Sequence, residues 1–122
     1  MDYIEISGIR CRARIGVPDQ ERRAYQELRV DVSCGFDFTE ATEHDNLALS
    51  VDYEKVVDLV QRTAETSVWA LLETLTDTLC RALLLMPRMQ DVEVRVRKYP
   101  VDLQGRVDSV SAVMRRCKAA GS

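Results

Sequence analysis

The chain has very little histidine and no closely spaced cysteines. His44 is the only histidine, and the four cysteines occur singly, without a C-x-x-C pair. Zinc sites are built mainly from cysteine and histidine at short spacings. The sequence therefore predicts no metal site and no cofactor. Isolated cysteines are typical of a reducing compartment, so we expect free thiols that are mostly packed inside the protein.

Long apolar segments and an excess of positive charge are also lacking. The longest apolar run, Ala82 to Met86, is far shorter than the roughly 20 residues that span a membrane. The first residues, Met1-Asp2-Tyr3, do not show the basic and then apolar pattern of a signal peptide. The net charge is -3, whereas nucleic-acid-binding domains usually carry a positive excess. We expect a cytoplasmic protein that binds neither membranes nor nucleic acids.

The composition is that of an ordinary globular domain. Of the 122 residues, 46% are hydrophobic and 30% are charged. This length is sufficient for one hydrophobic core and too short for two. We therefore expect residues 1–122 to form a single domain.

Apolar residues alternate with polar ones near both ends of the chain, which indicates strands. The first strand covers 2–15, and its apolar positions shift from even to odd numbers at Ser7-Gly8, which predicts a β-bulge. Residues 16–25 are expected to form a loop. The remaining strands are expected over 28–38, 92–98 and 107–114.

The middle of the chain has apolar residues at helical spacing. One helix is predicted from Tyr53 to Ala64, with Ser50 or Asp52 as its N-cap. A second helix is predicted from Val68 to Leu83, after a Ser67 cap and before Pro87. Residues 39–50 show no clear pattern.

This order of elements predicts an α+β fold, a four-stranded antiparallel sheet with two helices on one face. The other face and the sheet edges would then be open in a single subunit. Exposed edges are either blunted by charge or paired with another chain. Arg10, Arg12 and Arg14 are candidates for blunting an edge; pairing of edges into a closed barrel of several subunits is the alternative that we favour.

Lys98 interrupts an apolar strand face. Val92, Val94 and Val96 mark the core side of their strand, and Lys98 is the next residue on that side. Burial disfavours the charged form of an amine, which makes Lys98 a candidate proton donor and acceptor. Alternatively, its amine passes out to solvent at the strand end beside Tyr99-Pro100.

Eight segments carry a resemblance to a known family. They are Ile15-Gly16-Val17, Glu21, Gln26 to Val32, Asp37 to Ala41, Asp45-Asn46, Val51-Asp52-Tyr53, Leu71-Leu72-Glu73 and Val94 to Lys98. In this order and spacing they resemble the dihydroneopterin aldolase family over nearly the whole chain. The family's tunnelling fold has the same order of strands and helices.

The resemblance implies an enzyme of folate biosynthesis. Its reaction is the retro-aldol cleavage of 7,8-dihydroneopterin into 6-hydroxymethyl-7,8-dihydropterin and glycolaldehyde. The N5=C6 imine of the dihydropterin ring accepts the electrons of the breaking bond, so neither a metal nor a Schiff base is required. The resemblance also implies a homo-oligomer, a tetrameric ring or an octamer, with sites between subunits.

The resemblance also assigns roles to individual residues. Lys98 corresponds to the lysine that transfers protons together with a water, and Glu21 to the loop acid beside it. Tyr53 corresponds to a tyrosine that reaches the site from a neighbouring subunit and assists protonation. Glu73 corresponds to the carboxylate that anchors the pterin, because two carboxylate oxygens match its paired N–H donors. Backbone contacts would come from Leu72 and Val51.

Two other activities stay open at this point. Dihydroneopterin triphosphate epimerase has a similar fold and a related lysine, and its final strand resembles Asp108 to Ser111. The protein could also be a pterin-binding subunit without turnover. The family commonly has proline directly after its lysine, whereas this sequence has Tyr99 there. Tyr99 is therefore a further candidate for lining the site.

Overall fold

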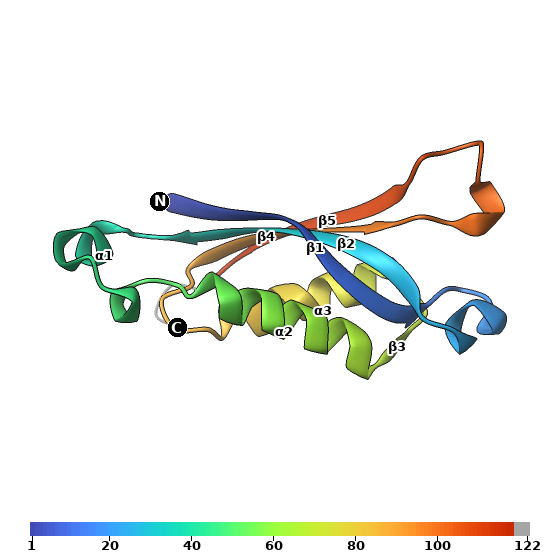
Figure 1. Cartoon of the computed structure of the whole chain (residues 1–122), viewed down its shortest axis with the longest axis horizontal. Coiled ribbons are helices and arrows are strands. Elements are labelled where there is room, and N and C mark those ends of the chain that lie inside the picture. Colours follow the sequence, from blue (N-terminus) through green and yellow to red (C-terminus); the bar gives the residue numbers. More distant parts are fainter. Residues whose placement is uncertain (119–122) are drawn as a thin grey trace.

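A twisted β-sheet with two helices on one face makes up the protein in a computed structural model that describes residues 1–118 (Figure 1). Within this range the sheet has the strand order β3-β1-β2-β4-β5. The strands are β1 (Asp2–Ile15), β2 (Gln26–Phe36), β3 (Val68–Trp69), β4 (Asp91–Lys98) and β5 (Val110–Cys117). The two longer helices are α2 (Tyr53–Thr66) and α3 (Leu72–Leu84). None of the helices in this part of the chain is both long and apolar enough to cross a membrane.

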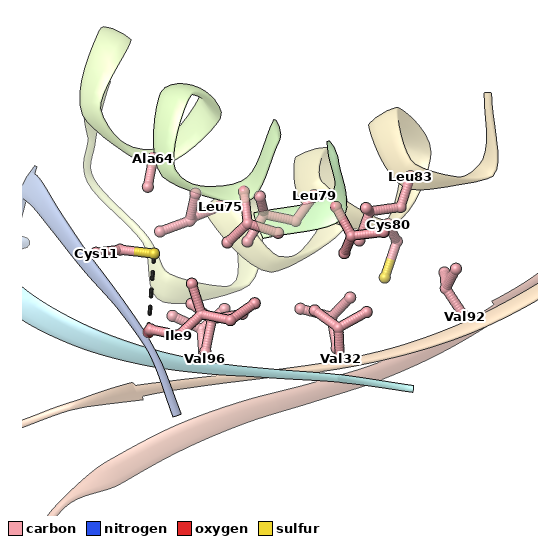
Figure 2. Close-up of a cluster of buried hydrophobic side chains, with 14 of the residues drawn as sticks. Ile9, Cys11, Val32, Ala64, Leu75, Leu79, Cys80, Leu83, Val92 and Val96 are labelled. Atoms are coloured by element: carbon pink, nitrogen blue, oxygen red, sulfur yellow. Dashed lines mark hydrogen bonds between the residues drawn. The ribbon is translucent and has the colours of Figure 1, made fainter. Parts of the chain in front are cut away.

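The core lies between the sheet and the two helices. Val92, Val94 and Val96 of β4 are fully buried, as the alternation predicts. The apolar stripes of α2 and α3 point toward the sheet, and Figure 2 shows Ala64, Leu75 and Leu79 above the strand residues. Burying a valine or leucine side chain contributes about 1.5–3 kcal/mol, so this layer is the main source of stability.

The predicted bulge in β1 is confirmed. The pairing of β1 with β2 shifts its register between Ile6 and Ile9, and Gly8 has a φ of +71°. The backbone N–H of Gly8 donates a hydrogen bond of 2.7 Å to Asp31 Oδ1. The extra residue explains why the core-facing positions change from even to odd numbers along one strand.

The expectation of four antiparallel strands is wrong in one respect. Val68 and Trp69 form β3, which pairs in parallel with Arg14 and Ile15 of β1. The second helix therefore begins at Leu72, and Ser67 is the C-cap of α2. Trp69 is 7% exposed, and its indole N–H donates to the Ala64 carbonyl at 3.0 Å. Burial of the Trp69 ring against the end of α2 holds this segment extended. A helix at this position would prevent that burial.

Three other boundaries differ from the sequence pattern. Strand β2 ends at Phe36, and the Phe38 ring packs at a tilt against the Phe36 ring, with centroids 4.8 Å apart. The segment without a clear pattern contains a short helix, α1 (Thr39–His44), and the 3-10 helix η2 (Leu47–Leu49). Strand β5 begins at Val110 rather than at Val107, because the preceding turn contains the 3-10 helix η3 (Val101–Leu103), and the Val107 N–H bonds back to the Leu103 carbonyl.

The N-cap of α2 is Asp52, one of the two expected residues. Its Oδ1 accepts a hydrogen bond of 3.0 Å from the Glu54 N–H. Gln61, on the same helix, donates from Nε2 to the Arg10 carbonyl of β1 at 2.9 Å. Since β1 pairs with β3 only at Arg14 and Ile15, this contact satisfies part of an otherwise open strand edge.

All four cysteines are free thiols, as expected. Cys11, Cys34 and Cys80 are buried, and Cys117 is exposed. Burial raises the pKa of each of the three buried thiols to about 11. These three side chains therefore pack as small apolar groups.

A hydrogen-bonded cluster joins three strands at the end of the sheet where β4 begins. Asp91 Oδ2 accepts hydrogen bonds from Arg115 Nη2 at 2.6 Å and from the Tyr3 hydroxyl at 3.0 Å. Gly35 lies between Tyr3 and Asp91 in the sheet register, and a Cβ there would lie only 2.9 Å from the Tyr3 ring. The missing side chain thus allows β1 to reach β4 across β2.

Because of this cluster, we expect the folded state to become less stable as the pH falls. Hydrogen bonds from Arg115 and then from Tyr3 lower the pKa of Asp91 below its usual value. A carboxylate with a lowered pKa stabilises the folded state above its unfolded-state pKa of about 3.9, and this contribution is lost as pH falls through the folded-state pKa. Asp91→Asn should lower the melting temperature at pH 7. It should also make the melting temperature less dependent on pH between about 5 and 2. Thermal unfolding across this range measures both effects.

Asp58→Asn is a suitable control because Asp58 is an exposed residue of α2. This variant should keep the pH dependence of the parent. If Asp91→Asn were to lose stability in acid as steeply as the parent, the cluster would not be the source of the effect.

Candidate active site

Lys98 and Glu21 form an ion pair at the end of the sheet where β4 stops. Lys98 Nζ donates a hydrogen bond of 2.7 Å to Glu21 Oε2. The side chains are 15% and 30% exposed, respectively. The amine is therefore neither enclosed by apolar groups nor free in solvent, the two alternatives that the strand pattern left open. It is held by a carboxylate in a half-buried position, where a proton can pass between the protein and a bound molecule.

Glu21 belongs to a loop that is fixed by several hydrogen bonds. The loop contains the 3-10 helix η1 (Asp19–Arg23), in which the Glu21 N–H donates to the Pro18 carbonyl at 3.1 Å. Arg22 Nη1 donates to the carbonyls of Gly16 and Val17, both at 2.8 Å. These contacts hold the loop backbone against the end of β1, so the position of Glu21 is determined by the fold.

Gly16 makes room for the Glu21 side chain. A Cβ added at Gly16 would lie 2.3 Å from Glu21 Cβ and 2.6 Å from Glu21 Oε2. The Gly16 N–H donates to the Trp69 carbonyl at 3.0 Å, which continues the pairing of β1 with β3. The sequence pattern assigns Gly16 no role beyond membership of a motif and does not mark Trp69 as part of the site. Their role depends on a three-dimensional contact that no spacing reveals.

Leu72 and Glu73 lie in the first turn of α3, directly after β3. Because β3 pairs with the end of β1, this turn lies at the same end of the molecule as η1 and the end of β4 (Figure 1). Glu73 is exposed and Leu72 is half-buried. Acidic side chains are favourable in the first turn of a helix, so the fold presents a carboxylate near the Lys98 end of the sheet.

Tyr53 and Val51 lie at the start of α2, the end of that helix that is remote from Trp69. Tyr53 begins α2 and is 59% exposed, although its place in the apolar stripe was compatible with the core. Val51 is 3% exposed. The far end of α2, through Ala64, contacts Trp69. Since a helix rises 1.5 Å per residue, the 14-residue α2 holds Tyr53 about 20 Å from that end. One chain therefore does not bring Tyr53 to Lys98.

The other expectations about the site concern a metal and Tyr99. Among residues 1–118, no group of three or more histidine, cysteine, aspartate or glutamate side chains could hold a metal ion. The absence of a cofactor stays a prediction. Tyr99 follows the last residue of β4 and is 47% exposed. Side chains alternate along a strand, so Tyr99 continues the face opposite to that of Lys98, and its role in the site also stays a prediction.

Comparison with known proteins establishes the family. A family model described as FolB, dihydroneopterin aldolase, matches residues 4–115. The chain belongs to the dihydroneopterin aldolase family. A dihydroneopterin aldolase from Methylorubrum extorquens is 28% identical over 98 residues, which cover 80% of this chain and 75% of that protein. A dihydroneopterin triphosphate 2'-epimerase from Pseudomonas aeruginosa is 24% identical over 98 residues, or 80% of each chain.

Solved structures of this family have the same fold. The FolB structure from Vibrio cholerae superposes with a TM-score of 0.89 at 22% identity, covering 97% of this chain and 98% of the other. The structure of the Escherichia coli aldolase in complex with neopterin has a TM-score of 0.87 at 24% identity, covering 95% and 99%. At this identity the likeness concerns the fold, and it confirms the α+β architecture expected from the sequence, with β3 as the addition.

Proposed function

We propose that this member of the dihydroneopterin aldolase family cleaves 7,8-dihydroneopterin into 6-hydroxymethyl-7,8-dihydropterin and glycolaldehyde, a step of folate biosynthesis. The observation that carries the proposal is the half-buried pair of Lys98 and Glu21, with Nζ and Oε2 2.7 Å apart. The pair lies within the part of the chain that the family model matches. It supplies an amine and a carboxylate for proton transfer next to the first turn of α3.

The reaction requires proton transfers and an electron acceptor within the substrate. The bond between C1' and C2' of the substituent breaks. Its electron pair forms a double bond between C6 and C1', and the former N5=C6 π electrons take up a proton at N5, which gives an enamine. The hydroxyl on the departing carbon loses its proton, and that fragment leaves as glycolaldehyde. Protonation of C1' and loss of the proton from N5 then restore the N5=C6 imine and yield the hydroxymethyl product. In this scheme Lys98 transfers protons, and Glu21 positions its amine and binds the substrate hydroxyls.

In the same proposal the pterin ring lies against the start of α3. The Glu73 carboxylate accepts the paired N–H donors of the aminopyrimidinone, which fixes the orientation of the ring. The backbone of Leu72 supports the same edge. Both residues lie at the Lys98 end of the molecule, so a bound ring there would direct its substituent toward the ion pair.

We further propose that the site is shared between copies of the chain. Tyr53 and Val51 lie at the start of α2, a helix length from the end of α2 that contacts Trp69, so they take part only if a neighbouring copy presents its own α2 start. In a head-to-tail contact of this kind each copy is rotated relative to the one before it. If these rotations add up to a full turn, the copies form a closed ring. The expected assembly is a tetrameric ring or a pair of stacked rings.

Mixing two inactive variants tests the shared site. Lys98→Ala and Tyr53→Phe should each have low activity alone. After subunit exchange at equal concentrations, about one site in four should combine an intact Lys98 with a neighbour's intact Tyr53, so activity should rise toward a quarter of the parent value. A site made within one chain would give no such recovery, and light scattering should show the assembly in each sample.

Identification of the products tests the reaction. Purified protein incubated with 7,8-dihydroneopterin should release 6-hydroxymethyl-7,8-dihydropterin and glycolaldehyde. The triphosphate of dihydroneopterin is the matched second substrate, and its conversion to an epimer without cleavage of the first substrate would favour the epimerase of this family. Binding of pterin without any product would favour a binding subunit.

A further inference from the structure

Three arginines lie side by side across the sheet. In the strand register, Arg10 of β1 is opposite Arg29 of β2, and Arg29 is opposite Arg97 of β4. Their strand neighbours Cys11, Val30 and Val96 face the helices and are buried. Because side chains alternate along a strand, the three arginines, which we call the arginine row, lie on the face that the helices leave uncovered.

The arginine row brings like charges close together. Neighbouring strands are about 4.8 Å apart, so the backbone positions of the three arginines span only about 10 Å across the sheet. Like charges directly opposite each other in a sheet are destabilising. This arrangement is also unexpected in a protein whose net charge is -3. An anionic partner would relieve this repulsion.

The nearest acids compensate the row only in part. Glu27 Oε1 binds Arg29 Nη1 at 2.5 Å, and the pKa of Glu27 is lowered first by this hydrogen bond and also by the charge of Arg10. Asp31 Oδ2 is 3.8 Å from Arg97 Nη2, beyond hydrogen-bonding distance, while its Oδ1 accepts from the Gly8 N–H. Two carboxylates thus serve three guanidinium groups.

Positive charge continues along β1 beyond the row. Arg12 and Arg14 lie over the Tyr25 ring, with Cζ atoms 4.9 Å and 5.4 Å from its centroid. Glu65 pairs with Arg12. Arg14 Nε is a buried nitrogen without a hydrogen-bond partner among the described residues. Arg12 is thus compensated by an acid of α2, and Arg14 is the residue that adds positive charge beyond the row.

We propose that the arginine row is a binding site for an oligophosphate group. Guanidinium groups bind phosphate oxygens through paired N–H donors, and a series of linked phosphates offers one anionic group after another along a line. The side chains of Arg29 and Arg97 are 27% and 33% exposed, and Arg10 is exposed, so the row is accessible. The site is separate from the Lys98–Glu21 pair and does not depend on the aldolase reaction.

Binding of sodium tripolyphosphate tests the proposal. Calorimetric titration at low ionic strength should show saturable binding to the parent, and the double variant Arg10→Gln/Arg97→Gln should bind at least tenfold more weakly. Arg81→Gln is the matched control, because Arg81 lies on α3 and pairs with Asp77; it removes one positive charge from the helix side and should bind like the parent. Sodium sulfate at matched ionic strength should not replace tripolyphosphate.

Thermal unfolding is a second measurement, and it distinguishes loss of the binding site from misfolding of the variant. Without tripolyphosphate the double variant should unfold cooperatively, at a temperature equal to or above that of the parent, since like charges have been removed. With tripolyphosphate the melting temperature should rise for the parent and for Arg81→Gln but not for the double variant.

Three results would overturn the proposal. These are no saturable binding by the parent, equal binding by the parent and the double variant, and a loss of binding in Arg81→Gln as large as in the double variant. If the double variant changed the molecular mass measured by light scattering while tripolyphosphate did not bind the parent, the arginine row would belong to a contact between copies instead.

Discussion

Replacing Lys98 with alanine is expected to lower kcat for 7,8-dihydroneopterin by about 10²–10⁴-fold, the usual contribution of a positioned proton-transfer group. Only the amine and its methylene groups are removed, at the last residue of β4, and the buried core residues of that strand stay in place. The KM should change little, because the pterin ring is assigned to the start of α3. Steady-state kinetics and equilibrium binding of neopterin measure the two effects separately.

The protein offers a matched control for this variant. Lys118 follows the end of β5, and its backbone N–H, rather than its side chain, bonds to the Gln90 carbonyl. Lys118→Ala should keep the activity of the parent. Equal activity of Lys98→Ala and the parent would remove the proposed mechanism, whereas loss of cooperative unfolding in Lys98→Ala would point to a structural cause.

Gly16→Ala is expected to have the second largest effect, although the new methyl group would not itself contact substrate. The added Cβ would lie 2.3 Å from Glu21 Cβ, so Glu21 has to move. Its carboxylate then no longer holds the Lys98 amine at 2.7 Å. We expect kcat to fall by about 10–100-fold, since small displacements of catalytic groups have effects of this size.

A double-mutant cycle separates displacement of Glu21 from general disruption of the loop. If Gly16 acts only through Glu21, then Gly16→Ala should reduce activity little further in a Glu21→Ala background. Additive losses would show that the methyl group acts by another route. Circular dichroism should be unchanged in all three variants, because residue 16 can keep its pairing with Trp69 through the backbone N–H.

Most of the fold could be predicted because its strands and helices are long enough to show a period. The alternation along β4 and the helical spacing of Val56, Val60 and Ala64 both correspond to buried faces. Strand β3 could not be predicted, since two residues contain no period, and Val68 stands at helical spacing from Leu72. The choice between strand and helix there depends on the burial of Trp69, a tertiary contact.

The site was less accessible to sequence reasoning than the fold. The strand pattern alone placed Lys98 on the core side and left its environment open. Its contact with Glu21 joins residues 77 positions apart and depends on the path of a loop without a period. The resemblance supplied Glu21, Glu73 and Tyr53 as candidates. The structure brings Glu21 to Lys98 and exposes Tyr53 at the other end, but the roles of these residues stay predictions.

The burial of three thiols has a practical consequence for measuring this protein in solution. Thiolates are the species that react with maleimides, so Cys11, Cys34 and Cys80, with pKa values of about 11, should resist labelling. Cys117 is exposed and lies opposite Asp91, the first residue of the eight-residue strand β4. A fluorophore there would be attached once per subunit, about 23 Å from Lys98 along the strand. It would report on the subunit exchange expected for the proposed assembly without any engineered cysteine.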